Sequence, residues 1–138
     1  MGLNAEIKNA VNWEAPVVAM DDSLRVVIQK MVDSKNSAVL VKAGDDVVGI
    51  VTDMDMLASI ARHDDLDGTK VSGFMTSCEL ILGKPVKSPC AQLDSAQSVG
   101  DAIGVMNVAG VHHLVVSGEK DVCAGVVSVL DLLKLVIS

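Results

Sequence analysis

The sequence contains the same segment twice, and this duplication constrains the fold more than any other feature. Apolar residues at positions i, i+3, i+4 and i+7 predict a helix that begins at Leu24, because this spacing places them on one helix face. The same pattern recurs about 75 residues further on, beginning at Val99. A serine precedes each predicted helix, Ser23 and Ser98, and its hydroxyl oxygen is expected to cap the helix N-terminus.

A β-rich run follows each of these helices. In the first copy, segments 38–41 and 47–51 flank a turn-forming stretch, so a hairpin is predicted there. Segments 114–116 and 122–127 repeat the pattern in the second copy. A short strand is expected before each first helix, at 16–19 and 90–93, and a second helix after each hairpin. Each copy is therefore predicted to run strand, helix, strand, strand, helix, which makes an α/β (α+β) fold.

The length and composition fit two small units that share a core. The chain has 138 residues, of which 50% are hydrophobic, so it can bury a sizeable interior. Units this small bury too little surface alone, so we expect them to pack together around a pseudo-twofold axis. The predicted first unit is 1–66, with an N-terminal helical segment, and the second is 67–138. An insertion near 77–88 could cover a pocket, meet a partner or form a plain surface loop.

Charge and composition exclude several classes of partner. The net charge of -7, without a basic cluster, argues against nucleic acid, as does the presence of only two aromatic residues, Trp13 and Phe74. The longest uncharged stretch, 102–118, contains two histidines and three glycines, so no membrane span is expected. The cysteines are odd in number and lack a CxxC pair, which argues against a disulfide framework and a zinc site: Cys78, Cys90 and Cys123. With no export or lipidation signal visible, a cytoplasmic location is expected.

A signature of the form Gly-x-x-Ser/Thr-x-x-Asp ends each predicted hairpin, at residues 49–55 and 125–131. The second copy also has Met75-Thr76 at its start and Val111-His112-His113-Leu114-Val115-Val116 before its hairpin. Over residues 11 to 137 the sequence resembles a tandem pair of CBS domains, the regulatory fold called a Bateman module. The resemblance implies a regulatory protein rather than an enzyme, which forms a homodimer and signals to a separate, unidentified partner protein.

The signature is suited to a nucleotide. A strand end that leads into a helix N-terminus offers unpaired amides to a phosphate, and the hydroxyl of Thr52 or Ser128 can add a donor. One turn later, the carboxylate of Asp55 or Asp131 can accept hydrogen bonds from both ribose hydroxyls. The resemblance implies an adenine ligand: AMP, ADP, ATP or S-adenosylmethionine. The predicted ligand-binding residues are Gly49, Thr52, Asp55, His112, His113, Gly125, Ser128 and Asp131.

The same residues allow a second interpretation that needs no ligand. Ser/Thr-x-x-Asp at the start of an apolar helix is also a capping box, so the protein could be a dimerisation or interaction module that binds no nucleotide. In relatives that bind adenylate, a His and a basic residue contact phosphate where this chain has His112 and His113. Alternatively, one of these histidines is a surface residue and the other lies under the sheet. Adjacent strand residues point to opposite faces, so the pair is not expected to share a metal ion.

The two copies differ in charge where a phosphate is expected. Asp53 and Met54 occupy positions at which family members often have Arg or Lys, and Asp53 at a helix start repels an anion. The strand entry of the first copy, residues 36–38, also lacks a basic residue. The second copy is therefore predicted to hold the better phosphate site. No nucleophile with a nearby base is visible in either copy, so no catalytic residue is predicted.

Overall fold

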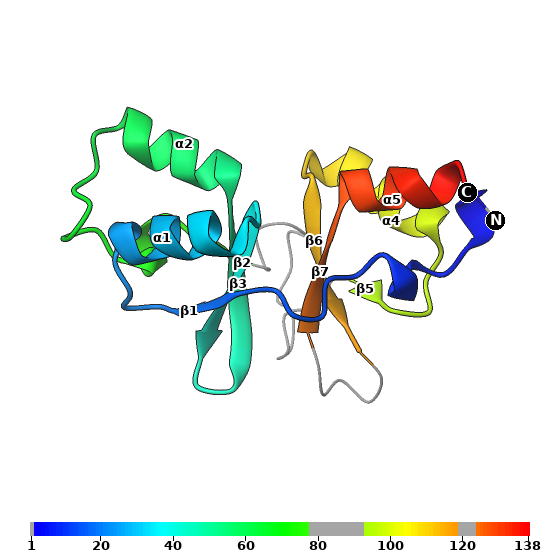
Figure 1. Ribbon diagram of the computed structural model, residues 1–138, viewed down its shortest axis with the longest axis horizontal. Helices are drawn as coiled ribbons and strands as arrows, with labels where there is room; N and C mark the ends of the chain where they lie inside the picture. The colour runs from blue at the N-terminus through cyan, green and yellow to red at the C-terminus, as the bar shows by residue number, and fades with distance from the viewer. Residues whose placement is uncertain (1, 78–92, 119–123) are drawn as a thin grey trace. The chain divides into compact units, whose positions relative to one another are not determined.

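The computed structural model describes residues 2–77, 93–118 and 124–138 and divides the chain into two compact units. The first unit is Ala15–Cys90, and the second combines Met1–Glu14 with Ala91–Ser138. Both have the predicted strand, helix, strand, strand, helix order, so the duplicated α/β fold is confirmed (Figure 1). The three cysteines and all but the first residue of the predicted insertion 77–88 lie outside the described residues.

The first unit is a four-stranded sheet with two helices on one face (Figure 1). Its elements are β1 (Val17–Ala19), α1 (Leu24–Ser34), β2 (Ala38–Ala43), β3 (Asp46–Thr52), α2 (Asp53–Ala61), a 3-10 turn at Val71–Gly73 and β4 (Thr76–Ser77). The strand order is β1-β2-β3-β4. β1 is parallel to β2, whereas β2, β3 and β4 pair antiparallel.

The core of the first unit forms where the apolar face of α1 meets the sheet. Leu24 and Val27 of α1 are fully buried, as the helical spacing predicts. Residues 38–41 of β2 are buried on both faces, so this strand is a continuous apolar run rather than an alternating one. At the helix start, the Val26 N–H donates to the Ser23 hydroxyl at 3.3 Å, which confirms the predicted cap.

The second unit repeats this arrangement around a three-stranded sheet. Its elements are β5 (Leu93–Asp94), α4 (Val99–Ala109), β6 (His113–Ser117), β7 (Ala124–Ser128) and α5 (Val129–Val136), with strand order β5-β6-β7. The predicted cap of α4 is present, because the Asp101 N–H donates to the Ser98 hydroxyl at 3.1 Å. The helix ends at Gly110, whose positive φ of 69° suits a glycine.

The N-terminal segment packs on the second unit, which differs from the predicted boundary between 1–66 and 67–138. The helical segment predicted at the chain start consists of two short 3-10 helices, Gly2–Asn4 and Ile7–Asn9. The Ile7 side chain is fully buried, and the Ile7 N–H donates to the Gln97 carbonyl at 3.0 Å. Further along, Asn12 forms an antiparallel bridge with Val126 of β7. These backbone contacts join the chain start to α4 and β7, and a boundary drawn from the duplication alone does not include them.

Within residues 2–77, 93–118 and 124–138, no helix has the length and apolar character needed to cross a membrane.

Candidate functional site

The two signatures lie where predicted, at the junctions between β3 and α2 and between β7 and α5. Thr52 ends β3 and is the N-cap residue of α2, and Ser128 ends β7 and is the N-cap residue of α5. Both N-cap residues have extended backbone conformations, which is the geometry that allows a side chain to reach the first turn of the helix. Sequence reasoning therefore identified both junctions and both caps.

At the first junction, the Asp55 carboxylate is occupied by the chain itself. The Thr52 N–H donates to Asp55 Oδ2 at 2.9 Å, and the Thr52 hydroxyl lies 3.4 Å from the same oxygen. Thr52 and Asp55 thus form a capping box. The Thr76 hydroxyl of β4 adds hydrogen bonds to Oδ1 at 3.1 Å and to Oδ2 at 3.3 Å. The first carboxylate therefore fixes both the start of α2 and the edge strand β4.

At the second junction, the carboxylate of Asp131 is less occupied. The Ser128 hydroxyl donates to Asp131 Oδ2 at 2.8 Å and accepts from the Asp131 N–H at 3.2 Å. In the described part of the chain, Oδ1 of Asp131 accepts no hydrogen bond. Both aspartates therefore contact their own N-cap residue, as the ligand-free interpretation predicts, but only Asp131 keeps an open oxygen.

At each of the two signature glycines, another segment of the chain passes close to the glycine backbone. A Cβ at Gly49 would lie 2.8 Å from the Thr76 carbonyl oxygen and 3.1 Å from Met75 Sδ. A Cβ at Gly125 would lie 2.5 Å from Val11 Cγ1 and 2.9 Å from Trp13 Cε3. Each glycine is therefore required by a neighbouring strand or bridge that passes close to its backbone. Their contact with a ligand remains a prediction.

The two histidines occupy different environments. His113 is the first residue of β6, is 8% exposed, and pairs in register with Ser128. His112 precedes the strand and is exposed, and its carbonyl accepts the Val129 N–H at 2.9 Å. This split follows from the alternation of side chains at the strand entry. His112 is the member of the pair that a ligand can reach.

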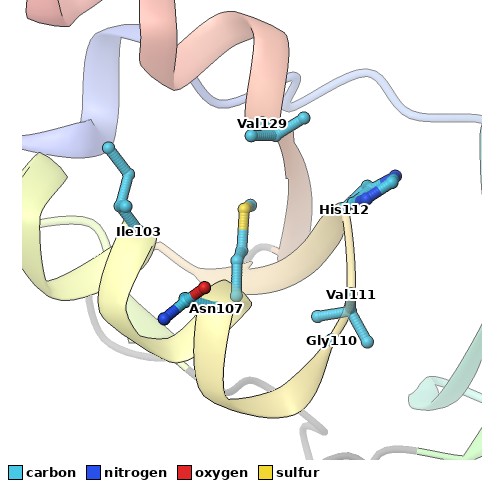
Figure 2. A pocket seen from close by; sticks show the side chains of 7 residues that line it. Ile103, Asn107, Gly110, Val111, His112 and Val129 are labelled. Atoms are coloured by element: carbon cyan, nitrogen blue, oxygen red, sulfur yellow. The ribbon is translucent and has the colours of Figure 1, made fainter.

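A pocket of about 300 Å³ lies beside the second junction (Figure 2). Figure 2 shows that it is lined by α4 from Ile103 onward, the loop that follows and the first residue of α5. The lining residues are Ile103, Met106, Asn107, Gly110, Val111, His112 and Val129. The pocket is mostly apolar with an imidazole and an amide, a composition typical of small-molecule sites. Of this group, the sequence analysis predicted only His112 as a ligand-binding residue.

The corresponding positions in the first unit carry different side chains. There the Asp53 N–H donates to the Ser37 carbonyl at 2.9 Å, which matches the contact between Val129 and His112. Asp53 therefore stands in the place of Val129, and Ser37 in the place of His112. The Asp53 carboxylate also accepts the Met54 N–H at 2.9 Å, so an acid occupies the helix start at which an anion would bind.

In the first unit, pKa shifts occur at two carboxyl groups in the turn after α2 and at an arginine of α1 that contacts this turn. Hydrogen bonds from Ser59 and Arg62 lower the pKa of the Asp64 carboxyl, and the hydrogen bond from Arg25 lowers that of Asp67. The Asp67 hydrogen bond and charge in turn raise the pKa of Arg25, which contacts Asp67 at 2.7 Å. Among the described residues, no three His, Cys, Asp or Glu side chains group as a metal site. This acidic turn is therefore tied to the fold by arginines.

Comparison with protein-family models gives one match, which occurs twice: the CBS domain, at residues 7–62 and again at 84–138. Comparison with curated protein sequences gives no match. Among solved structures, a CBS-domain crystal structure is 24% identical, with a TM-score of 0.77, and the match covers 97% of this chain and 98% of that one. A putative signal-transduction protein with CBS domains from Burkholderia ambifaria is 27% identical, with a TM-score of 0.73 and coverage of 89% and 82%. A CBS domain pair/ACT domain protein from Thermotoga maritima is 20% identical, with a TM-score of 0.65 and coverage of 96% and 97%.

Proposed function

The chain belongs to the CBS-domain family, and we propose that it is a regulatory module that binds an adenine nucleotide or a related adenosyl ligand. Its CBS pair is the regulatory type of module found in homologues, one of which is described as a putative signal-transduction protein. The candidate ligands are AMP, ADP, ATP and S-adenosylmethionine. The proposal includes a separate partner protein that responds to the bound state and does not include catalysis by this chain.

One observation carries this proposal: an open carboxylate oxygen at the start of α5, next to a pocket that contains an imidazole. Asp131 Oδ1 can accept from a ribose hydroxyl, since a carboxylate has room for several donors. The exposed His112 side chain can donate to a phosphate. The N–H of Leu130, the second residue of α5, lacks an intrahelical acceptor because of its position in the first turn. Acceptor, donor and apolar surface thus lie around one helix start.

The competing function is an interaction module that binds no nucleotide, and one observation favours it. Asp55 and Asp131 both contact their own N-cap residues, so each signature contributes to helix stability without a ligand. A module of this kind would keep its fold and its partner binding but show no response to nucleotides.

We also propose that the protein forms a homodimer through α2 and α5. Both helices expose apolar side chains at equivalent positions: Met54 (62%), Leu57 (62%), Leu130 (61%) and Leu133 (48%). Exposed apolar side chains that repeat along a helix are typical of protein interfaces. Because each repeat carries the same apolar face, a second copy of the chain offers a matching surface on both helices.

Titration calorimetry and thermal shift with AMP, ADP, ATP and S-adenosylmethionine test the nucleotide proposal. A ligand at one hundred times its dissociation constant should stabilise the protein by about 2.7 kcal/mol, which is readily visible as a rise in melting temperature. The absence of heat and of any shift at millimolar concentrations of all four ligands would reject the sensor and leave the interaction module.

A further inference from the structure

The two junctions share one sequence signature but differ in what their carboxylates contact. We infer that each chain binds a single nucleotide, at the β7–α5 junction, because hydrogen bonds from Thr76 occupy the Asp55 carboxylate at the other junction. This inference rests on the proposed function, and it assigns to Thr76 the role of closing the first site.

The hydrogen bonds of Asp55 leave it little capacity for a ribose. Oδ2 receives the Thr52 N–H at 2.9 Å and lies within 3.4 Å of both the Thr52 and Thr76 hydroxyls. Oδ1 receives the Thr76 hydroxyl at 3.1 Å. A ribose diol would have to displace Thr76, and β4 would then lose a side-chain contact that holds it to the start of α2.

Asn12 takes the place of Thr76 in the second unit. Asn12 bridges Val126 of β7 as Thr76 pairs with Ile50 of β3. The Asn12 side chain, however, accepts the Glu14 N–H at 3.0 Å through Oδ1. No described residue donates to Asp131 Oδ1, so this oxygen can accept from a ligand without the loss of a protein contact.

The charges at the two helix starts also favour the second junction as the nucleotide site. In the first unit, Asp53 places a carboxylate at the helix start and accepts the Met54 N–H, so both repulsion and the loss of a donor oppose a phosphate. In the second unit the corresponding residue is Val129, and the exposed His112 lines the adjacent pocket. The hydrogen bonding of the carboxylates and the charge at the helix starts are independent features, and both favour the second junction.

Titration calorimetry with AMP and ATP on the full chain tests the inference through its stoichiometry. We expect one nucleotide per chain for the unmodified protein. Asp131→Asn should weaken binding by about tenfold or more, whereas Asp55→Asn should leave the affinity within about twofold. Circular dichroism of each variant checks that it is folded. Asp55→Asn is expected to melt at a lower temperature, because it weakens the capping box.

A second experiment tests the role of Thr76 directly. The variant Thr76→Val keeps a β-branched side chain in β4 but frees Asp55 Oδ1. Adenosine, which lacks the phosphate that Asp53 repels, is the probe. We expect the adenosine stoichiometry to rise from one per chain to two.

The outcomes separate the inference from the function on which it rests. Two nucleotides per chain in the unmodified protein, or equal losses in Asp55→Asn and Asp131→Asn, would overturn the single site but keep the nucleotide sensor. An adenosine stoichiometry of one in Thr76→Val would overturn the role of Thr76. No binding of any nucleotide to the unmodified protein would reject the proposed function and the inference together.

Discussion

The hydroxyl of Thr76 donates to both carboxylate oxygens of Asp55, at 3.1 and 3.3 Å, across a separation of 21 residues. Asp55 starts a helix and Thr76 belongs to an edge strand, so this contact joins two elements that have no other side-chain hydrogen bond between them among the described residues. One side chain therefore serves as a helix cap and as the attachment point of a strand.

Thr76→Val should lower the free energy of unfolding by about 1 kcal/mol, because a partly buried hydrogen bond to a charged acceptor is lost. Urea denaturation followed by circular dichroism measures the change. Thr69→Val is the matched control, since only the backbone of Thr69 forms hydrogen bonds in this region. Equal destabilisation by the two substitutions would show that the effect comes from valine itself.

A Gly125→Ala substitution should destabilise the protein by about 1 to 3 kcal/mol, because the added methyl group overlaps the N-terminal segment. The new Cβ would lie 2.5 Å from Val11 Cγ1 and 2.8 Å from the Asn12 carbonyl oxygen. Gly104→Ala is the control: it lies inside α4, no described atom outside the surrounding turns of that helix is within 4 Å of its Cβ position, and alanine favours helix. We expect Gly104→Ala to raise the melting temperature and Gly125→Ala to lower it. A neutral Gly125→Ala would mean that residues 11–13 separate easily from β7.

How much of this could be predicted from the sequence depends on how local each signal is. The helices that begin at Leu24 and Val99, their serine caps and both hairpins follow from patterns within a few residues, and all were predicted. The pairing of β4 with β3 was not, because a two-residue strand has no periodicity and its partner lies far away in the chain. Met75-Thr76 was recognised only as the opening of the second copy.

The candidate site shows the same limit. The signature located both junctions, and the charge of Asp53 predicted that they would differ. The signature could not show which carboxylate is free, since Asp55 and Asp131 have equivalent positions in it, and the hydrogen bonds from Thr76 to Asp55 come from a strand outside it. The sequence left open whether both histidines meet a phosphate or whether one lies on the surface and the other under the sheet. The second alternative depends on the residue at which β6 begins, His113, and the sequence pattern does not define that position.

Acidification should destabilise the turn after α2. The pKa values of Asp64 and Asp67 are lowered in the folded chain by hydrogen bonds from Ser59, Arg62 and Arg25. A lowered pKa stabilises the fold above the carboxyl's unfolded value, and that stabilisation is lost as the pH falls through the lowered value. Melting temperatures between about pH 6 and pH 2 should therefore fall.

Arg25→Gln is expected to reduce this fall, because it removes the donor that lowers the pKa of Asp67. The effect should also shrink in high salt, since the pair is exposed. If the pH dependence of melting is the same in Arg25→Gln and the unmodified chain, the Arg25–Asp67 pair contributes nothing to acid stability.

Leu57→Glu and Leu133→Glu should each convert the proposed dimer to a monomer, because they place a carboxylate in the middle of an apolar helix face. Light scattering coupled to size exclusion measures the mass. Val108→Glu is the control, since Val108 is 89% exposed but lies on α4. A monomeric unmodified protein, or a mass that none of the three substitutions changes, would contradict an interface on α2 and α5.

His112→Ala should weaken the binding of AMP several-fold but leave that of adenosine unchanged, because the exposed imidazole is placed to meet a phosphate rather than the nucleoside. His113→Ala is the contrasting variant. Its side chain is 8% exposed at the start of β6, so its removal leaves a cavity and should lower the melting temperature without discriminating between the two ligands. Titrations of both ligands with both variants measure the difference. Equal loss of AMP and adenosine binding in a folded His112→Ala protein would place the phosphate away from this pocket, since a residue that contacts only the phosphate cannot affect a ligand that lacks one.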